Sequence, residues 1–165
     1  MDLYILRHAI AEDRAPALPD SQRHLTPDGA RKMRRAAKGM KALDLKFDLI
    51  LSSPYLRAKE TAEIAAKVLD CEKAMHFSAT LVSDGSPKEL IEELRGKHGK
   101  KKHIMVVGHE PYLSTLISLL VSGHTDIAIN LKKGGLCKLS INTLHYGRCA
   151  TLEWLLTPAE LRFLK

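Results

Sequence analysis

A chain of 165 residues is long enough for one domain with its own hydrophobic core and too short for two. Its 45% hydrophobic and 27% charged residues are typical of a soluble globular protein, with no signal peptide and no apolar run near the roughly 20 residues of a membrane span. The formal net charge of +7 favours anionic partners: phosphorylated molecules, acidic protein surfaces or nucleic acid.

The first three quarters of the chain alternate between apolar runs and segments with helical spacing of apolar residues. Buried strands are expected at residues 3–7, 47–52, 74–77 and 103–107. Helices are expected at residues 27–43, 56–68, 87–96 and 111–122. A threonine or serine followed by proline, at Thr26-Pro27 and Ser86-Pro87, is typical of a helix start, and Ser86 to Glu89 has the pattern of a capping box.

The pattern changes after Gly123. Two strands are expected at residues 136–141 and 149–155, antiparallel to each other, and a capping box from Thr157 to Glu160 predicts a short final helix. We therefore expect one α/β domain over residues 1–165. Its architecture should be a three-layer α/β/α sandwich whose mainly parallel sheet has an antiparallel edge near the C-terminus.

The cysteines and the densest group of lysines bear on localisation and partners. Cys71, Cys137 and Cys149 have no Cys-x-x-Cys spacing, so we interpret them as reduced thiols of a cytoplasmic protein. A disulfide between Cys137 and Cys149 across a hairpin is the alternative. Four lysines lie within residues 97–102 with few aromatic residues to stack on bases, so we expect a solvated loop and no nucleic-acid partner.

Three of the predicted strands end in residues that can bind or attack phosphate. The first ends in Arg7-His8, the second is followed by Arg57 in the first turn of the next helix, and the fourth ends before His109. Because the carboxyl ends of parallel strands share one edge of a sheet, we expect these side chains to meet in one pocket. Two arginines and two histidines would repel one another without an anion, so the pattern predicts a tetrahedral oxyanion site.

Three motifs, in this order, resemble those of the histidine phosphatase (phosphoglycerate mutase-like) superfamily. They are Leu6-Arg7-His8-Ala9, residues 52–62 (SSPYLRAKETA) and residues 107–111 (VGHEP). Alanine replaces the glycine of the usual Arg-His-Gly motif, so the fold has to accommodate one extra methyl group. With residues 23–26 (RHLT) and 131–135 (LKKGG), and without the helical insertion of the mutases, the chain looks most similar to the SixA branch, the phosphohistidine phosphatases.

The resemblance implies a mechanism in which His8 attacks phosphorus and becomes a phosphohistidine. Arg7, Arg57 and His109 would hold the phosphate oxygens, and Arg23 matches a branch position that also reaches the phosphate. His109 has to be protonated to bind the oxyanion, and a bound phosphate would favour this state. No cofactor and no metal ion are expected, because the sequence has no metal-ligand spacing such as His-Glu-x-x-His.

The general acid is the open role. Glu110, directly after the second histidine, is the first candidate, and the alternative is that it only caps the helix that starts at Pro111. Asp84 and Glu89 lie where other family members carry an acid and are further candidates. A phosphohistidine expels an imidazole, which leaves more readily than an alkoxide, so the role can also be vacant.

The predicted function is that of a metal-independent phosphatase, active as a monomer. Its preferred substrate is phosphohistidine on proteins, because a short chain without a lid predicts an open pocket. A phosphomonoesterase of small phosphorylated metabolites is the alternative, and it would need further specificity groups, for which Lys132 and Lys133 are candidates. A non-catalytic module that binds phosphate or nucleic acid is the third possibility, although such a module needs no nucleophilic histidine.

Overall fold

Six strands form one sheet in the computed structural model, which describes residues 1–164. The strands are β1 (Asp2–Arg7), β2 (Leu49–Ser52), β3 (Met75–Phe77), β4 (His103–Gly108), β5 (Leu136–Ile141) and β6 (Ala150–Leu156). The helices are α1 (Pro27–Ala42), α2 (Leu56–Val68), α3 (Pro87–His98), α4 (Tyr112–Ser122) and α5 (Pro158–Leu161). Short 3-10 turns are η1 (Asp20–Gln22), η2 (Glu72–Ala74) and η3 (Ala79–Leu81).

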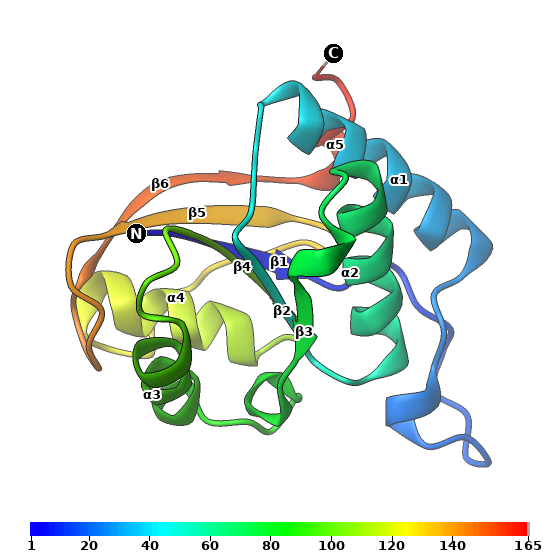
Figure 1. Cartoon of the computed structure of the whole chain (residues 1–165). Helices are drawn as coiled ribbons and strands as arrows, with labels where there is room; N and C mark the ends of the chain where they lie inside the picture. The colour runs from blue at the N-terminus through cyan, green and yellow to red at the C-terminus, as the bar shows by residue number, and fades with distance from the viewer. Residues whose placement is uncertain (165) are drawn as a thin grey trace.

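The sheet has the strand order β3-β2-β4-β1-β5-β6. Its first four strands are parallel, whereas β5 runs antiparallel to both β1 and β6. Helices α1, α2 and α5 lie on one side of the sheet, and α3 and α4 lie on the other (Figure 1). This arrangement confirms the predicted three-layer α/β/α sandwich with an antiparallel edge near the C-terminus.

The central strands are buried on both faces, which explains why they are apolar without interruption. Along β1, Leu3 and Ile5 belong to the apolar layer beneath α3 and α4. Their neighbours Tyr4 and Leu6 belong to the layer beneath α1 and α2, because successive side chains of a strand point to opposite faces. Arg7 and His8 therefore follow a strand that is fixed from both sides.

The start of α1 is fixed against the segment that follows β1. Thr26 is the N-cap, and its hydroxyl accepts a hydrogen bond from the Gly29 N–H at 3.0 Å. A Cβ at Gly29 would lie 2.0 Å from the carbonyl oxygen of Ile10, so only glycine allows this approach. The close contact keeps the segment after His8 against α1.

Several predicted boundaries are wrong by one or two residues. The second strand begins at Leu49, because the Asp48 carboxylate accepts hydrogen bonds from the N–H groups of Lys102 and His103, both at 2.9 Å. Helix α3 continues past Gly96 to His98, because a single glycine lowers helix propensity without ending the helix. Helix α4 begins at Tyr112, one residue later than predicted, and β6 covers residues 150–156 instead of 149–155.

The capping box predicted at the C-terminus is present, with both hydrogen bonds between Thr157 and Glu160. At Ser86 the hydroxyl accepts from the Glu89 N–H at 3.5 Å, which is one half of the predicted box. The three cysteines are free, and Cys137 lies opposite Leu155 in the hairpin, so the alternative disulfide does not form.

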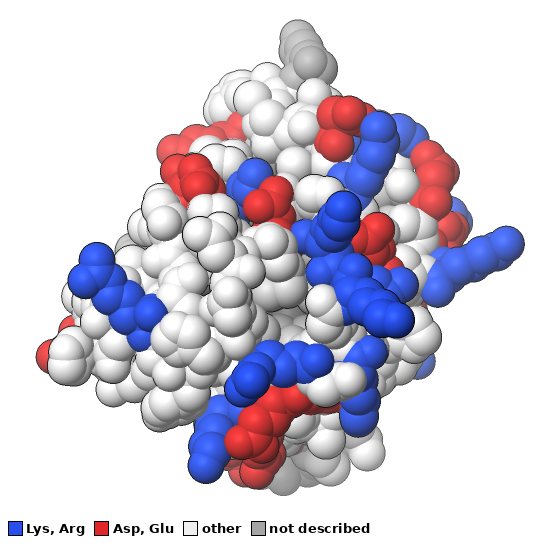
Figure 2. Space-filling view, turned by 60° about the vertical axis from the view of Figure 1, so that its left-hand side comes forward, with Lys and Arg blue, Asp and Glu red and all other residues white. Residues whose placement is uncertain are grey.

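The surface carries its charge unevenly. Lys and Arg side chains crowd the right-hand part of the face in Figure 2, whereas much of the left-hand part is uncharged. No helix within residues 1–164 is long and apolar enough to cross a membrane. Asp and Glu side chains lie among these cations, so both kinds of charge are concentrated in one part of this face (Figure 2).

Candidate active site

The carboxyl ends of β1, β2 and β4 lie side by side and bring the predicted residues together. Arg7 pairs with Gly108 between β1 and β4. One residue further along, the His8 N–H donates to the Gly108 carbonyl at 3.0 Å. The rings of His8 and His109 are consequently 5.2 Å apart, centroid to centroid, and tilted by 50°.

His8 has the protonation state of a nucleophile. Its Nδ1 lies 2.7 Å from the Ala9 carbonyl oxygen, which can only accept, so Nδ1 carries the proton and Nε2 keeps its lone pair. Burial lowers the pKa of His8, the bond to Ala9 partly offsets this, and the charges of Arg57 and Arg7 lower the pKa further, to about 3. The imidazole is therefore neutral at physiological pH.

Ala9 accommodates its extra methyl group. The residue is 3% exposed and packs in the apolar layer beneath α1 and α2. Its N–H donates to the Thr61 hydroxyl at 3.0 Å, and that hydroxyl donates to the Arg57 carbonyl at 2.6 Å. The segment after His8 is thus tied to the first turn of α2, where Arg57 lies.

His109 is 1% exposed and is held through its Nε2, which lies 2.8 Å from the Ser53 hydroxyl. The same hydroxyl accepts from the Tyr55 N–H at 3.3 Å, so its own hydrogen is available to His109. We therefore assign the ring proton to Nδ1, which is buried and has no hydrogen-bond partner in residues 1–164.

The charge of His109 differs from the protonated state that phosphate binding requires. Burial, together with the charge of Arg57, lowers the pKa of His109 to about 3. The ring is therefore neutral until a negative ligand is bound. A dianion beside Nδ1 would raise the pKa again, which agrees with the expectation that phosphate favours the protonated form.

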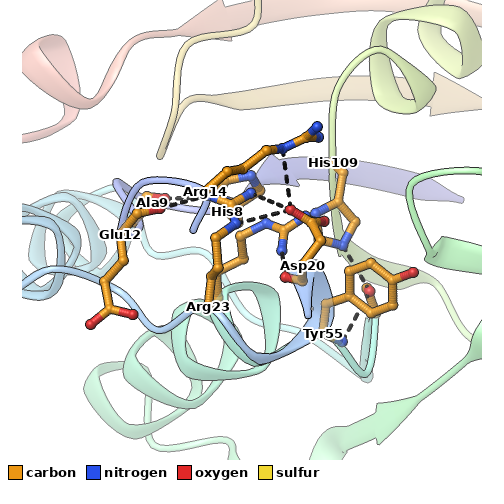
Figure 3. A network of polar contacts seen from close by, with 10 residues as sticks. His8, Ala9, Glu12, Arg14, Asp20, Arg23, Tyr55 and His109 are labelled. Atoms are coloured by element: carbon orange, nitrogen blue, oxygen red, sulfur yellow. Dashed lines mark hydrogen bonds and ion pairs between the residues drawn. The ribbon is translucent and has the colours of Figure 1, made fainter. Parts of the chain in front are cut away.

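Arg57 is 3% exposed, and both of its terminal nitrogens bind Asp20. Nη1 donates to the Asp20 carbonyl at 2.6 Å and Nη2 to its carboxylate at 2.8 Å. The carboxylate also accepts from Arg23, at 2.9 Å from Nε and 2.8 Å from Nη2, and Arg14 lies 3.5 Å away. Asp20 thus lies at the centre of the network, with Arg14 and Arg23 turned toward it (Figure 3).

Asp20 supplies a negative charge beside the guanidinium groups of the site. Burial alone would raise the pKa of this carboxyl group, but the hydrogen bonds from Arg23 and Arg57 outweigh burial and lower the pKa. Asp20 is therefore ionised at neutral pH and compensates two neighbouring guanidinium groups. Arg23, which was predicted to reach a phosphate, is linked to Arg57 through this carboxylate.

Arg7 is anchored to a second loop, the one before β5. Its Nη1 donates to the Leu131 carbonyl at 2.9 Å. Among residues 1–164, the buried side-chain N and O atoms without a hydrogen-bond partner are Arg7 Nε, Arg57 Nε, His109 Nδ1 and the Tyr112 hydroxyl. Three of these four are nitrogens of the predicted site, and the oxygens of a bound oxyanion would satisfy them.

Glu110 is held at the start of α4. Its carboxylate accepts from the N–H of Ser114 at 3.1 Å and from the Ser114 hydroxyl, which is the helix-capping arrangement. Burial lowers the pKa of Arg7, and the charge of Glu110 partly offsets this lowering.

The other two candidates for the general acid, Asp84 and Glu89, are exposed side chains. No group of three or more His, Cys, Asp or Glu in residues 1–164 could hold a metal ion.

Asp20 and Ser53 are two members of the site that the sequence did not identify. Ser53 stands inside the second motif, but nothing in its spacing shows that it would meet a residue 56 positions away. Asp20 lies in a loop without periodicity. Its position three residues before Arg23 is the one feature of the sequence that indicates an ion pair. This spacing does not predict the contact with Arg57.

The two buried histidines make stability depend on pH. An unfolded histidine takes up a proton below its ordinary pKa of 6.5, whereas His8 and His109 stay neutral in the fold down to about pH 3. Acidification therefore favours the unfolded chain. From pH 7 to pH 5 the free energy of unfolding should fall by about 2–4 kcal/mol from these two residues, measured by urea denaturation without phosphate. The double variant His8→Gln/His109→Gln should show a flatter profile, and an unchanged slope would contradict the assignment.

Known proteins resemble this chain in sequence and in fold. Residues 3–81 match the family model of the histidine phosphatase superfamily (branch 1). An uncharacterized protein of Picosynechococcus sp. is 36% identical over 140 residues, 84% of either chain, and phosphohistidine phosphatase SixA of Escherichia coli is 25% identical over 100% of this chain and 99% of SixA. The solved complex of the protein histidine phosphatase SixA with tungstate shares the fold, with a TM-score of 0.83, 23% identity and coverage of 98% and 99% of the two chains. The chain therefore belongs to the histidine phosphatase superfamily.

Proposed function

We propose that this protein is a phosphatase that transfers a phosphoryl group to His8 and then to water. The observation that carries the proposal is the neutral, buried His8, whose protonated Nδ1 is bound to Ala9 and whose Nε2 is free. In the first step Nε2 forms a bond to phosphorus while the bond to the leaving group breaks. In the second step water attacks phosphorus, inorganic phosphate leaves and His8 is restored.

The cations around His8 have a role in both steps. Arg7, Arg57 and Arg23 bind the equatorial oxygens, and His109 donates from Nδ1, so that negative charge is stabilised most strongly as the transition state forms. Because guanidinium and imidazole groups supply this charge, we propose a reaction that needs no metal ion or other cofactor. The similarity to a SixA that binds tungstate, a tetrahedral oxyanion, supports this use of the site.

The proposed substrate is phosphohistidine on a protein. Glu110 is the carboxyl group that we propose as a proton donor to the leaving group. Its carboxylate accepts hydrogen bonds from both the N–H and the hydroxyl of Ser114, which makes it a poor donor. An imidazole leaving group has little need of such a donor, whereas an alkoxide depends on one. The full-length similarity to phosphohistidine phosphatase SixA supports the same substrate.

A phosphomonoesterase of small metabolites is the second candidate. The observation that favours it is the pair of exposed lysines, Lys132 and Lys133, beside Arg7, which could bind a further anionic group of a metabolite. In that case Glu110→Gln should reduce turnover strongly. For a phosphohistidine substrate the same variant should keep most of its activity.

The deciding experiment compares turnover of a phosphohistidine-bearing protein with turnover of a panel of phosphate esters, all in excess EDTA. We expect kcat/KM to be highest for phosphohistidine. A higher kcat/KM on one of the esters would assign the protein to the second candidate. Activity that appears only after addition of a divalent metal would contradict the metal-independent reaction.

We further propose that the enzyme works as a single-domain monomer in the cytoplasm. Its three cysteines are free, as expected in a reducing compartment. Light scattering of the purified chain tests the oligomeric state, and a mass of about 18.4 kDa is expected.

A further inference from the structure

A groove of about 670 Å³ begins beside the phosphate-binding residues. Five of its lining residues are cations, namely Arg7, Lys32, Lys132, Lys133 and Arg162. No aspartate or glutamate of residues 1–164 lines this groove. The cations come from the end of β1, from α1, from the loop before β5 and from the residue after α5. The positive charge thus extends well beyond the immediate neighbours of His8.

The loop that carries Lys132 and Lys133 is fixed to the catalytic strand. The Gly134 N–H lies 3.1 Å from the Arg7 carbonyl and 3.2 Å from the His8 carbonyl, and the Arg7 N–H donates to the Gly135 carbonyl at 3.1 Å. Within the loop, the Gly135 N–H donates to the Lys132 carbonyl at 2.7 Å. The two lysines therefore have a defined position relative to the nucleophile.

Most of these cations form no ion pair with the residues that the structure describes. Within residues 1–164, Lys32 forms an ion pair with Asp28 at 2.6 Å, whereas the ion pairs of the protein include none for Arg7, Lys132, Lys133 or Arg162. Lys132 and Lys133 are exposed. A group of like charges held together on one wall is favourable only when an anionic partner binds there.

The lining of the groove also includes apolar groups, from Ile10, Pro158 and Ala159. A single phosphate group would need only the residues around His8. An extended wall that combines cations with apolar contacts suits an extended chain whose acidic side chains alternate with aliphatic ones. The volume is also in the range of sites that enclose a ligand of drug size or a short peptide segment.

We propose that this groove binds an acidic segment of the substrate protein, next to the phosphohistidine that enters the site. The inference rests on the proposed function and adds the chemistry by which the enzyme selects its protein substrate. Carboxylates of the segment pair with Lys132, Lys133 and Arg162, while the phosphoryl group is bound by Arg7 and its neighbours. The pairing raises kcat/KM through a lower KM, because it lies outside the reacting atoms.

The test uses two phosphohistidine peptides of equal length, one with acidic residues beside the phosphohistidine and one with the corresponding amides. The wild-type enzyme should prefer the acidic peptide by about tenfold in kcat/KM at low salt, and the preference should shrink as ionic strength rises. Lys132→Glu/Arg162→Glu should remove the preference. Free phosphohistidine reports on the catalytic site alone, and its turnover should stay unchanged in this variant.

Lys88→Glu/Arg95→Glu is the matched control for this double charge reversal, since Lys88 and Arg95 are exposed cations of α3 on the opposite side of the sheet. It should leave the preference for the acidic peptide intact. Equal turnover of the two peptides by the wild-type enzyme would overturn the groove proposal while leaving the phosphatase intact. A preference for a small metabolite with a second phosphate would also overturn it. Failure to hydrolyse any phosphohistidine compound, free or in a peptide, would instead overturn the proposed function.

Discussion

His8→Ala is expected to lower turnover of every substrate by at least about 10⁴-fold, because it removes the atom that forms the bond to phosphorus. The neighbouring groups cannot replace it. His109 uses its Nε2 in the bond with Ser53, and its Nδ1 carries the proton, so neither nitrogen has a free lone pair. Steady-state rates of His8→Ala on phosphohistidine and on an ester measure the effect.

A trapping experiment separates a nucleophile from a residue that merely stabilises the site. Substrate labelled with ³²P should leave an acid-labile, base-stable label on the wild-type protein during turnover. The label should be absent from His8→Ala and should persist longer in His109→Gln, where the phosphoenzyme forms but hydrolysis lacks one donor. Full activity of His8→Ala, or a label that remains in this variant, would contradict the mechanism.

The fold was predictable because its central strands are buried on both faces. Residues such as Ile5 and Val106 are 0% exposed, and such strands appear in the sequence as short runs of apolar residues that end abruptly. The abrupt ends then located Arg7, His8 and His109, since parallel strands deliver their following residues to one edge. The positions of these three residues therefore follow from the local sequence and from the rule that parallel strands end at one edge of a sheet.

The other parts of the site could not be predicted, because they depend on contacts between distant segments. No pattern in the sequence indicates that these segments meet. The bond from Arg57 to Asp20 joins α2 to the 3-10 turn η1, 37 residues earlier, and its geometry follows only from the packed fold. The predicted start of β2 is wrong for the same reason. It depends on the hydrogen bond that the Lys102 N–H donates to the Asp48 carboxylate. The protonation states of the histidines likewise depend on burial and on neighbouring charges, which a sequence does not specify.

Arg57→Ala should lower kcat/KM by about 10²–10³-fold, the usual effect of losing one charged donor to a transition-state oxyanion. Arg57→Lys should recover little of this loss. A lysine provides a point charge, whereas Arg57 uses Nη1 and Nη2 on Asp20 and leaves Nε and its planar charge for the ligand. Rates on phosphohistidine, together with inhibition by inorganic phosphate, measure transition-state and ground-state binding separately.

Asp20→Asn then shows whether the carboxylate acts through Arg57. Removing a negative charge beside the anion site should strengthen binding of inorganic phosphate by about three- to tenfold, because the ligand no longer competes with a carboxylate for the guanidinium groups. The same change should lower kcat, since Arg57 loses the bond that orients it. If Asp20 works through Arg57, Asp20→Asn should cost little further kcat in the Arg57→Ala background, whereas independent roles would give additive losses. Weaker phosphate binding by Asp20→Asn would show that the carboxylate supports the ligand-bound site more than it opposes the ligand.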